Sequence, residues 1–225
     1  MKLRALLLDF DGVILQSAAL KTQAFADLYP GTDPARLAAI VDYVERHGGV
    51  TRTDKLAHIE RAFFGRAGAP EDVAPLAARF RERVFDAVVS CPFVPGARRL
   101  LEHAHAAMDL HLVSGTPHDE LCEIVALRGL AGWFRSVRGA PPVKRVAFER
   151  ILHEGGYAPG EVLAVGDALT ECEAARDLGV AFLGVVPAGS HNRFPPEVPV
   201  VATLESVPEL LKLPKFVRYH EARSP

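Results

Sequence analysis

The chain begins with an apolar segment that ends abruptly at two acidic residues. Leu6, Leu7 and Leu8 are followed by Asp9, Phe10, Asp11 and Gly12 in the sequence 6–12. A short apolar run with charge at its end is typical of a strand buried in a parallel sheet, and we expect this strand over residues 3–9. Because side chains alternate along an extended chain, Asp9 and Asp11 should point the same way. Gly12 then permits a sharp change of direction and a close approach of the backbone to a ligand.

Between residues 16 and 91 the pattern changes to that of consecutive helices. Asp33 before Pro34 indicates a helix N-cap, and Thr51 with Asp54 three residues later indicates a capping box. No strand pattern separates these helices, so the simplest interpretation is a small helical bundle over 16–91. The predicted helices cover 17–29, 33–46, 51–64 and 72–89.

From residue 92 onward helix and strand patterns alternate. This alternation is typical of a parallel sheet covered by helices on both faces. Because the first strand belongs to the same sheet, the bundle interrupts the sheet domain as an insertion. We therefore expect an α/β fold with a core of 1–15 and 92–225, an inserted helical domain of 16–91, and an edge strand near 199–204. The other predicted elements are helix 97–107, strand 110–114, helix 118–129, strand 134–138, helix 144–154, strand 162–166, helix 171–178 and strand 181–186.

The composition argues against several classes of protein, namely nucleic-acid-binding, zinc-binding and membrane proteins. Hydrophobic residues make up 49% and charged residues 24% of the chain, which is ordinary for a soluble globular protein. The net charge of −2 gives no indication of nucleic-acid binding. The three cysteines lie far apart without a CxxC pair, which favours a reducing compartment and argues against a zinc site. No signal-peptide or membrane-spanning apolar segment is evident. We expect a cytoplasmic enzyme with no membrane or nucleic-acid partner, and its oligomeric state stays open.

Polar groups follow four of the predicted strands. Open parallel sheets bind ligands outside the carboxyl ends of their strands, so these groups should face one crevice. The hydroxyl and backbone N–H groups after the second strand, at the start of the next helix, suit an anion, and paired carboxylates suit a hard divalent cation. The groups are Asp9 and Asp11 after the first strand, Ser114, Gly115 and Thr116 after the second, Lys144 after the third, and Asp167 with Glu171 after the fourth.

In their order and spacing these segments resemble the four motifs of the haloacid dehalogenase-like hydrolase superfamily, and the helical insertion resembles its C1-type cap. The resemblance implies a Rossmann-like core with strand order 5-4-1-2-3, a Mg²⁺ ion and an aspartyl-phosphate intermediate. It also implies that Asp9 is the nucleophile and Asp11 the general acid and base. By the same resemblance, the metal ligands are Asp9, Asp11 through its main-chain carbonyl, Asp167 and Glu171, and the phosphate-binding residues are Gly12, Ser114, Gly115 and Lys144.

Glu171 departs from the superfamily pattern, which usually has aspartate there. The glutamate side chain is one methylene longer, so we expect Glu171 to hold a metal-bound water, and direct coordination stays open. An ordinary acid in the first turn of a helix, where the dipole favours it, is the alternative.

The inserted helices hold further candidates for contact with a substrate. Residues 49–56 resemble the cap segment of β-phosphoglucomutases, in which the matching arginine binds a substrate phosphate. Arg52 and Lys55 could therefore bind a carboxylate or a second phosphate, although Arg52 could equally cap or solvate its helix. His47, before two glycines, is a weaker candidate, and His111, inside a strand, is expected to be a hydrogen-bonded core histidine.

The chemistry of phosphate esters supports these assignments. Their uncatalysed hydrolysis is so slow that enzymes accelerate it by up to ~10²¹-fold, whereas acid–base catalysis alone contributes about 10²–10⁴. A carboxylate nucleophile divides the reaction into two steps, and Mg²⁺ with Lys144 would neutralise the repelling charges. The leading hypothesis is a Mg²⁺-dependent phosphomonoesterase for a small metabolite, such as a sugar phosphate or a phosphoglycolate-like acid. A β-phosphoglucomutase-like mutase is the first alternative, and a non-catalytic binding protein on the same scaffold is the more remote one.

Overall fold

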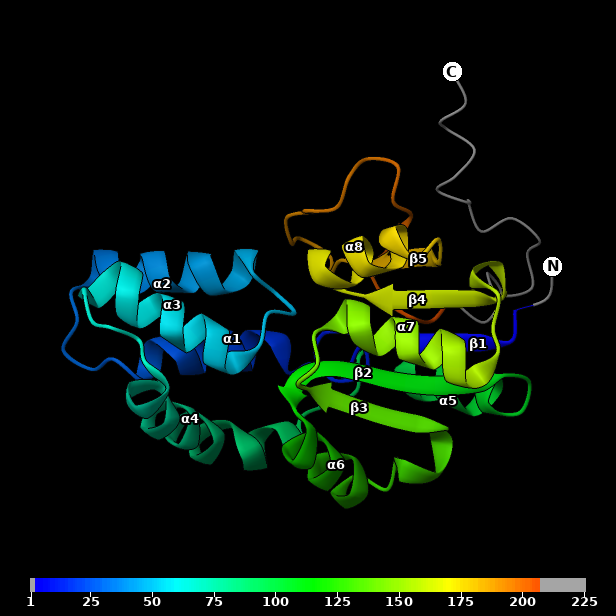
Figure 1. Ribbon diagram of the computed structural model, residues 1–225, viewed down its shortest axis with the longest axis horizontal. Coiled ribbons are helices and arrows are strands. Elements are labelled where there is room, and N and C mark those ends of the chain that lie inside the picture. The colour runs from blue at the N-terminus through cyan, green and yellow to red at the C-terminus, as the bar shows by residue number, and fades with distance from the viewer. Residues whose placement is uncertain (1–2, 207–225) are drawn as a thin grey trace.

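A parallel six-stranded sheet forms the centre of the computed structural model, which describes residues 3–206 (Figure 1). The strand order is β3-β2-β1-β4-β5-β6, so the predicted order 5-4-1-2-3 is confirmed and the predicted edge strand follows β5. β1 lies between β2 and β4, and all four of its residues are buried. The strands are β1 (Ala5–Leu8), β2 (Asp109–Pro117), β3 (Ser136–Ala140), β4 (Val162–Gly166), β5 (Ala181–Val185) and β6 (Val200–Val201).

Helices cover both faces of this sheet, as the alternating pattern predicts. Leu6 and Leu8 of β1 belong to an apolar cluster that includes α5 and α6, whereas Leu7 belongs to a second cluster with α7 and α8. The two clusters lie on opposite faces because successive strand side chains alternate. The core helices are α5 (Ala97–His105), α6 (His118–Leu127), α7 (Lys144–Gly155) and α8 (Leu169–Asp177), with short 3₁₀ turns η1 (Ala131–Trp133) and η2 (Pro159–Glu161).

The four helices between β1 and α5 form a separate lobe, on the left in Figure 1. The Asp33 side chain accepts a hydrogen bond from Arg36 N at 3.0 Å, and Thr51 Oγ1 accepts one from Asp54 N at 3.2 Å, so both helices begin as the sequence predicts. The apolar cluster that includes α5 and α6 continues into this lobe. Residues 207–225 of the predicted core lie outside the described residues. The lobe contains α1 (Ala18–Asp27), α2 (Pro34–Arg46), α3 (Arg52–Phe64) and α4 (Pro70–Ser90).

Strand β2 continues beyond its predicted end, which corrects one expectation. It pairs with β3 as far as Pro117 opposite Ala140, with a register shift after Val113. Ser114 and the two residues after it therefore have strand backbone, and α6 begins only at His118. The expectation that these residues stand at the start of the next helix is wrong.

No helix among residues 3–206 combines the length and apolar character needed to cross a membrane.

His111 in β2 lies in a hydrogen-bonded network, as expected for a core histidine. Tyr157 O–H donates to the Asp109 carboxylate at 2.5 Å, and the same hydroxyl lies 3.3 Å from His111 Nε2. The Nε2–H therefore donates to Tyr157, which leaves Nδ1 to accept from the Ser136 hydroxyl at 2.8 Å. Burial lowers the pKa of His111 to about 4, although Asp109 opposes this shift. The imidazole is thus held in its neutral form.

This neutral histidine should make the fold sensitive to acid. His111 takes up a proton near pH 6.5 in the unfolded chain but only near pH 4 in the folded chain. Its contribution to the free energy of unfolding is therefore complete at neutral pH and is lost as the pH falls from about 6.5 to about 4. Between pH ~7.5 and ~5 the loss should be about 2 kcal/mol. Urea unfolding at the two pH values should show this loss in the wild type and a smaller one in His111→Gln. Equal losses in both proteins would contradict the assignment.

Candidate active site

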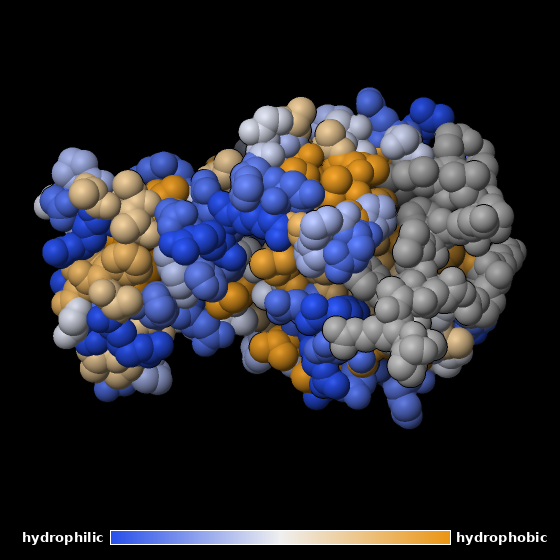
Figure 2. Space-filling model, turned by 90° about the horizontal axis from the view of Figure 1, so that it is seen from above, coloured by the Kyte–Doolittle hydropathy of each residue, from blue (hydrophilic) through white to orange (hydrophobic). Residues whose placement is uncertain are grey.

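A cavity of about 470 Å³ lies at the carboxyl ends of the strands, between the helical lobe and the core. Figure 2 shows hydrophilic residues gathered where the two lobes meet. The core contributes acids and hydroxyl groups to the cavity wall, and helix α3 contributes basic side chains. The lining includes Asp9, Asp11, Ser114, Gly115, Thr116 and Asp167 from the core and Arg52 and Lys55 from α3.

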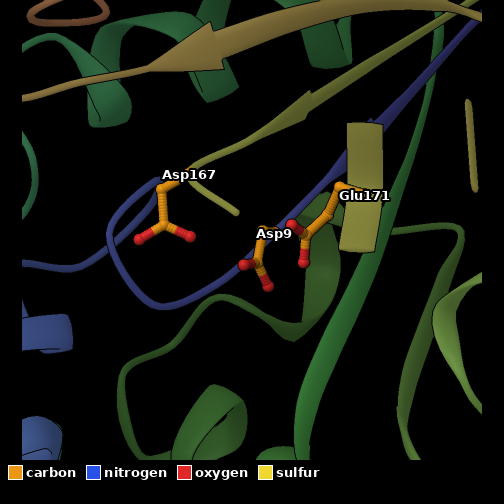
Figure 3. Close-up of side chains that lie close together, drawn as sticks. All are labelled: Asp9, Asp167 and Glu171. Carbon is orange, nitrogen blue, oxygen red and sulfur yellow. The ribbon is translucent and has the colours of Figure 1, made fainter. Parts of the chain in front are cut away.

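Three carboxylates from distant parts of the chain meet beside this cavity (Figure 3). Asp9 follows β1, Asp167 follows β4, and Glu171 lies in the first turn of α8. One oxygen of each carboxylate lies within 4.8 Å of one oxygen of the others. The convergence expected from the ends of β1 and β4 is therefore present.

Gly12 allows this close arrangement. Its φ of +78° lies in the left-handed region, and a Cβ at this position would lie 2.0 Å from Asp167 Oδ2. A side chain here would therefore both strain the backbone and displace the acid. In this structure Gly12 allows the loop after β1 to pass next to Asp167.

Lys144 provides the buried positive charge for the acids. Its ammonium lies 2.7 Å from Asp9 Oδ1 and forms a second ion pair with Glu171. Asp9 Oδ1 also accepts a hydrogen bond from Phe10 N at 2.8 Å. Burial would lower the pKa of Lys144, but the two carboxylates raise it above its ordinary value. Lys144 opens α7, as predicted, and remains a cation within this cluster.

One ammonium cannot balance all three of these acids in their ionised forms. Burial raises the pKa of Asp9 to about 7, and Lys144 only partly offsets the effects of burial and of Glu171. Burial, Asp9 and Glu171 likewise raise the pKa of Asp167 well above its ordinary value. Glu171 Oε2 is buried and has no hydrogen-bond partner among the described residues. Surplus charge and an unpartnered oxygen of this kind fit a hard cation such as Mg²⁺.

Asp11 lies apart from these three carboxylates, in a hydrogen-bonded cage of its own. Ser17 donates to Oδ1 at 2.5 Å, while Lys21 at 2.6 Å and Thr116 at 3.2 Å donate to Oδ2. Lys21 also donates to Thr116 Oγ1 at 2.8 Å, so helix α1 is joined to both β1 and β2. Burial alone would raise the pKa of Asp11, but Lys21, Ser17 and Thr116 bring it below its ordinary value. The carboxylate is therefore ionised and fixed in orientation.

The second strand contributes buried hydroxyl groups to the cavity. Ser114 Oγ accepts a hydrogen bond from Thr116 N and donates to Thr116 Oγ1, each at 3.1 Å. Gly115, between them, lies close to the turn that joins α2 to α3, because a Cβ there would be 3.0 Å from Gly49 O. The hydroxyls and Asp11 thus form one connected polar wall.

The three candidates in the helical lobe have different environments. Arg52 forms two hydrogen bonds to Glu120 of α6, at 2.9 and 2.6 Å, so a core carboxylate already pairs its guanidinium. Lys55 is buried, and its amine lies 5.5 Å from the centre of the Phe25 ring. His47 is exposed, hydrogen-bonds the Tyr43 carbonyl through Nδ1 and is not part of the cavity lining.

The turn between α2 and α3 closes one side of the site. Gly49 has a φ of +76°, and a Cβ on it would lie 1.8 Å from Thr170 Oγ1 and 2.9 Å from Glu171 Oε1. Only a glycine lets the helical lobe approach the first turn of α8 this closely. Thr170 also donates a hydrogen bond to Gly48 O at 3.4 Å.

Comparison with known proteins identifies the family. A family model described as haloacid dehalogenase-like hydrolase matches residues 3–179. The chain belongs to this hydrolase family. The family resemblance of its four motifs is thereby confirmed, and with it the expectation of an enzyme that catalyses hydrolysis.

Individual relatives of this haloacid dehalogenase-like hydrolase agree in length and fold. A phosphoglycolate phosphatase of Synechococcus elongatus is 26% identical over 190 residues, which cover 81% of this chain and 84% of the relative. A putative HAD-hydrolase, YfnB from Bacillus subtilis, solved bound to magnesium, has a TM-score of 0.71 at 18% identity, with 95% and 100% coverage. A putative β-phosphoglucomutase from Thermotoga maritima has a TM-score of 0.66 at 20% identity, with 93% and 99% coverage. The two structures share the fold.

Three residues of this hydrolase's site were not anticipated from the sequence. Ser17 and Lys21 stand four residues apart at the start of α1, a spacing that puts both on one helix face and could have indicated a shared partner. Glu120 carries no such signal, because it lies in α6 and its partner Arg52 lies far away in the chain.

Proposed function

We propose that this hydrolase is a Mg²⁺-dependent phosphomonoesterase that acts on a small phosphorylated metabolite through an aspartyl-phosphate. The observation that carries the proposal is the cluster of Asp9, Asp167 and Glu171 beside Lys144, with oxygens within 4.8 Å of one another. The phosphatase named among its relatives supports the same reaction. We also propose that residues 16–91 form the cap domain and that 1–15 and 92–225 form the catalytic core.

Mg²⁺ would be held by Asp9, Asp167, the main-chain carbonyl of Asp11 and, directly or through water, Glu171. When bound, it would neutralise charge on the phosphoryl group and on the acids around it. Lys144 adds a fixed positive charge 2.7 Å from Asp9, which lowers the repulsion between a carboxylate and an anionic phosphate. The metal and the lysine thus serve the same electrostatic purpose.

Asp9 is the nucleophile of the proposed reaction. Its carboxylate attacks phosphorus and the bond to the leaving oxygen breaks. The protonated form of Asp11, the minor form in the free enzyme, transfers its proton to this oxygen and becomes the carboxylate. In the second step Asp11 takes a proton from water, which attacks the phosphoryl group and frees Asp9. The cage of Ser17, Lys21 and Thr116 keeps Asp11 ionised, which favours its role as the base of this second step.

The remaining predicted residues would hold the transferring phosphoryl group. Ser114 can donate its hydroxyl and Lys144 its ammonium; both side chains are buried, and Lys144 lies 2.7 Å from Asp9. The backbone at Gly12 and Gly115 is free of side chains and can approach the phosphate oxygens closely. Hydrogen-bond donors fixed in advance around the phosphoryl group are the usual basis of such catalysis.

Removal of the metal gives a direct test. With p-nitrophenyl phosphate and Mg²⁺ we expect phosphate release that EDTA abolishes and added Mg²⁺ restores. Because Mg²⁺ binds the folded protein, it should also raise the melting temperature, and a hundredfold excess over Kd should stabilise the fold by about 2.7 kcal/mol. Asp167→Asn should shift both effects to higher Mg²⁺ concentrations. Turnover that is unaffected by EDTA would contradict the proposal.

A mutase assay separates the proposed hydrolysis from phosphoryl transfer between sugar hydroxyls. We expect release of inorganic phosphate and no interconversion of β-glucose 1-phosphate and glucose 6-phosphate. Net interconversion in place of phosphate release would favour the β-phosphoglucomutase-like alternative.

A further inference from the structure

Most basic side chains that line the cavity are already paired with a carboxylate. Lys55 is different, because no carboxylate among the described residues lies within ion-pair distance of its amine. The paired cations of the lining are Lys21 with Asp11, Arg46 with Asp42, Arg52 with Glu120, and Arg193 with Glu45.

The Arg52–Glu120 pair is the most completely buried of these. Its side chains are 7% and 4% exposed, and the guanidinium packs over the Phe80 ring at 4.5 Å. Both oxygens of Glu120 face the guanidinium, which is the forked geometry that would otherwise bind a phosphate. A phosphate that took this position would leave buried Glu120 with only the more distant Arg81, whose Nε lies 3.8 Å from Glu120 Oε2, and this loss of the closer partner is unfavourable.

Lys55 offers a single point charge to the same cavity. Its side chain is largely buried, and the aromatic face of Phe25 packs beside the amine. Burial lowers the pKa of Lys55 to about 8, and Asp167 opposes this shift, so the ammonium form still predominates at neutral pH. A lysine ammonium lacks the forked geometry of arginine and suits one carboxylate oxygen.

We propose that Glu120 is a specificity-determining residue, which holds Arg52 away from the substrate and excludes a second phosphate, while Lys55 binds one carboxylate on the substrate. The preferred substrate class is then a short phosphomonoester with a carboxylate at its other end. This inference rests on the proposed function, because Asp9 must act on the phosphate in the same cavity.

Three matched compounds test the inference: phosphoglycolate, 2-hydroxyethyl phosphate and ethane-1,2-diol bisphosphate. The wild type should prefer phosphoglycolate to 2-hydroxyethyl phosphate by about tenfold or more in kcat/KM, as expected for a hydrogen bond between charged groups. Lys55→Met should remove this preference, mainly through KM, because kcat/KM should fall much more for phosphoglycolate than for 2-hydroxyethyl phosphate. Glu120→Gln should raise the activity on the bisphosphate relative to phosphoglycolate.

Glu123→Gln is the matched control, because Glu123 lies on the same helix, is exposed and pairs with Arg81, which also contacts Glu120, but not with Arg52. It should leave all three ratios unchanged. Lys55→Met leaves the buried ion pair intact, so it tests the carboxylate contact even if Glu120→Gln fails to fold.

Calorimetry with Asp9→Asn adds a measurement that does not depend on turnover. Phosphoglycolate should bind more tightly than 2-hydroxyethyl phosphate in this background, and the difference should vanish when Lys55→Met is added. Equal affinities, or a preference that survives Lys55→Met, would overturn the inference. Failure to hydrolyse p-nitrophenyl phosphate would instead contradict the proposed function.

Discussion

Asp9→Asn is expected to lower kcat by at least about 10⁴-fold and to leave the fold intact. An asparagine amide cannot attack phosphorus, yet its oxygen can still accept the hydrogen bonds that Phe10 N and Lys144 make to Asp9. Phosphate release from p-nitrophenyl phosphate would measure the loss, and circular dichroism with thermal melting would verify the fold.

Asp11→Asn is the matched comparison, because it makes the same replacement of a carboxylate by an amide at the neighbouring acid. Loss of acid–base catalysis should lower kcat by about 10²–10⁴, less than the loss of the nucleophile. The phosphorylated enzyme should also accumulate, since water is no longer activated in the second step. If Asp9→Asn retained more activity than Asp11→Asn, the two roles would have to be reassigned.

Lys144→Met should destabilise the metal-free protein by about 3–5 kcal/mol, the usual cost of removing one partner from a buried ion pair. Asp9 and Glu171 would then face each other in the interior with no positive charge between them. Because Mg²⁺ can replace part of the missing charge, a saturating concentration should narrow the difference from the wild type. Urea unfolding in EDTA and in Mg²⁺ would measure both effects.

The neighbouring Arg145 gives the control for this substitution. Its side chain is 51% exposed and forms surface ion pairs, so Arg145→Met should change stability by no more than about 0.5 kcal/mol. A Lys144→Met protein as stable as Arg145→Met in EDTA would show that the buried acids do not need this lysine.

The convergence of Asp9, Lys144 and Asp167 could be predicted from sequence for a general reason. Each residue follows a strand of one parallel sheet, and the carboxyl ends of such strands share an edge. The apolar runs identify the strands and the polar residues mark their ends, so no knowledge of side-chain orientation is needed. Helix starts such as Asp33 and Thr51 were predictable for a similar reason, because their capping partners lie three residues away.

The contacts between the lobes could not be predicted in this way. Arg52 meets Glu120, and Lys21 meets Thr116, only because the helical lobe sits on the core in a particular orientation. Local periodicity contains no information about that orientation. The extension of β2 to Pro117 has a related cause, since it depends on pairing with β3 rather than on the residues of β2 alone.

The most direct test of the mechanism is to locate the phosphoryl group in the Asp11→Asn variant. The enzyme would be mixed with p-nitrophenyl phosphate and Mg²⁺, quenched in acid within the first turnover, digested and analysed by mass spectrometry. We expect one phosphoryl group on the peptide that contains Asp9, and none when Asp9→Asn is added. Release of p-nitrophenol without a phosphorylated peptide, or with the phosphoryl group on another residue, would contradict it.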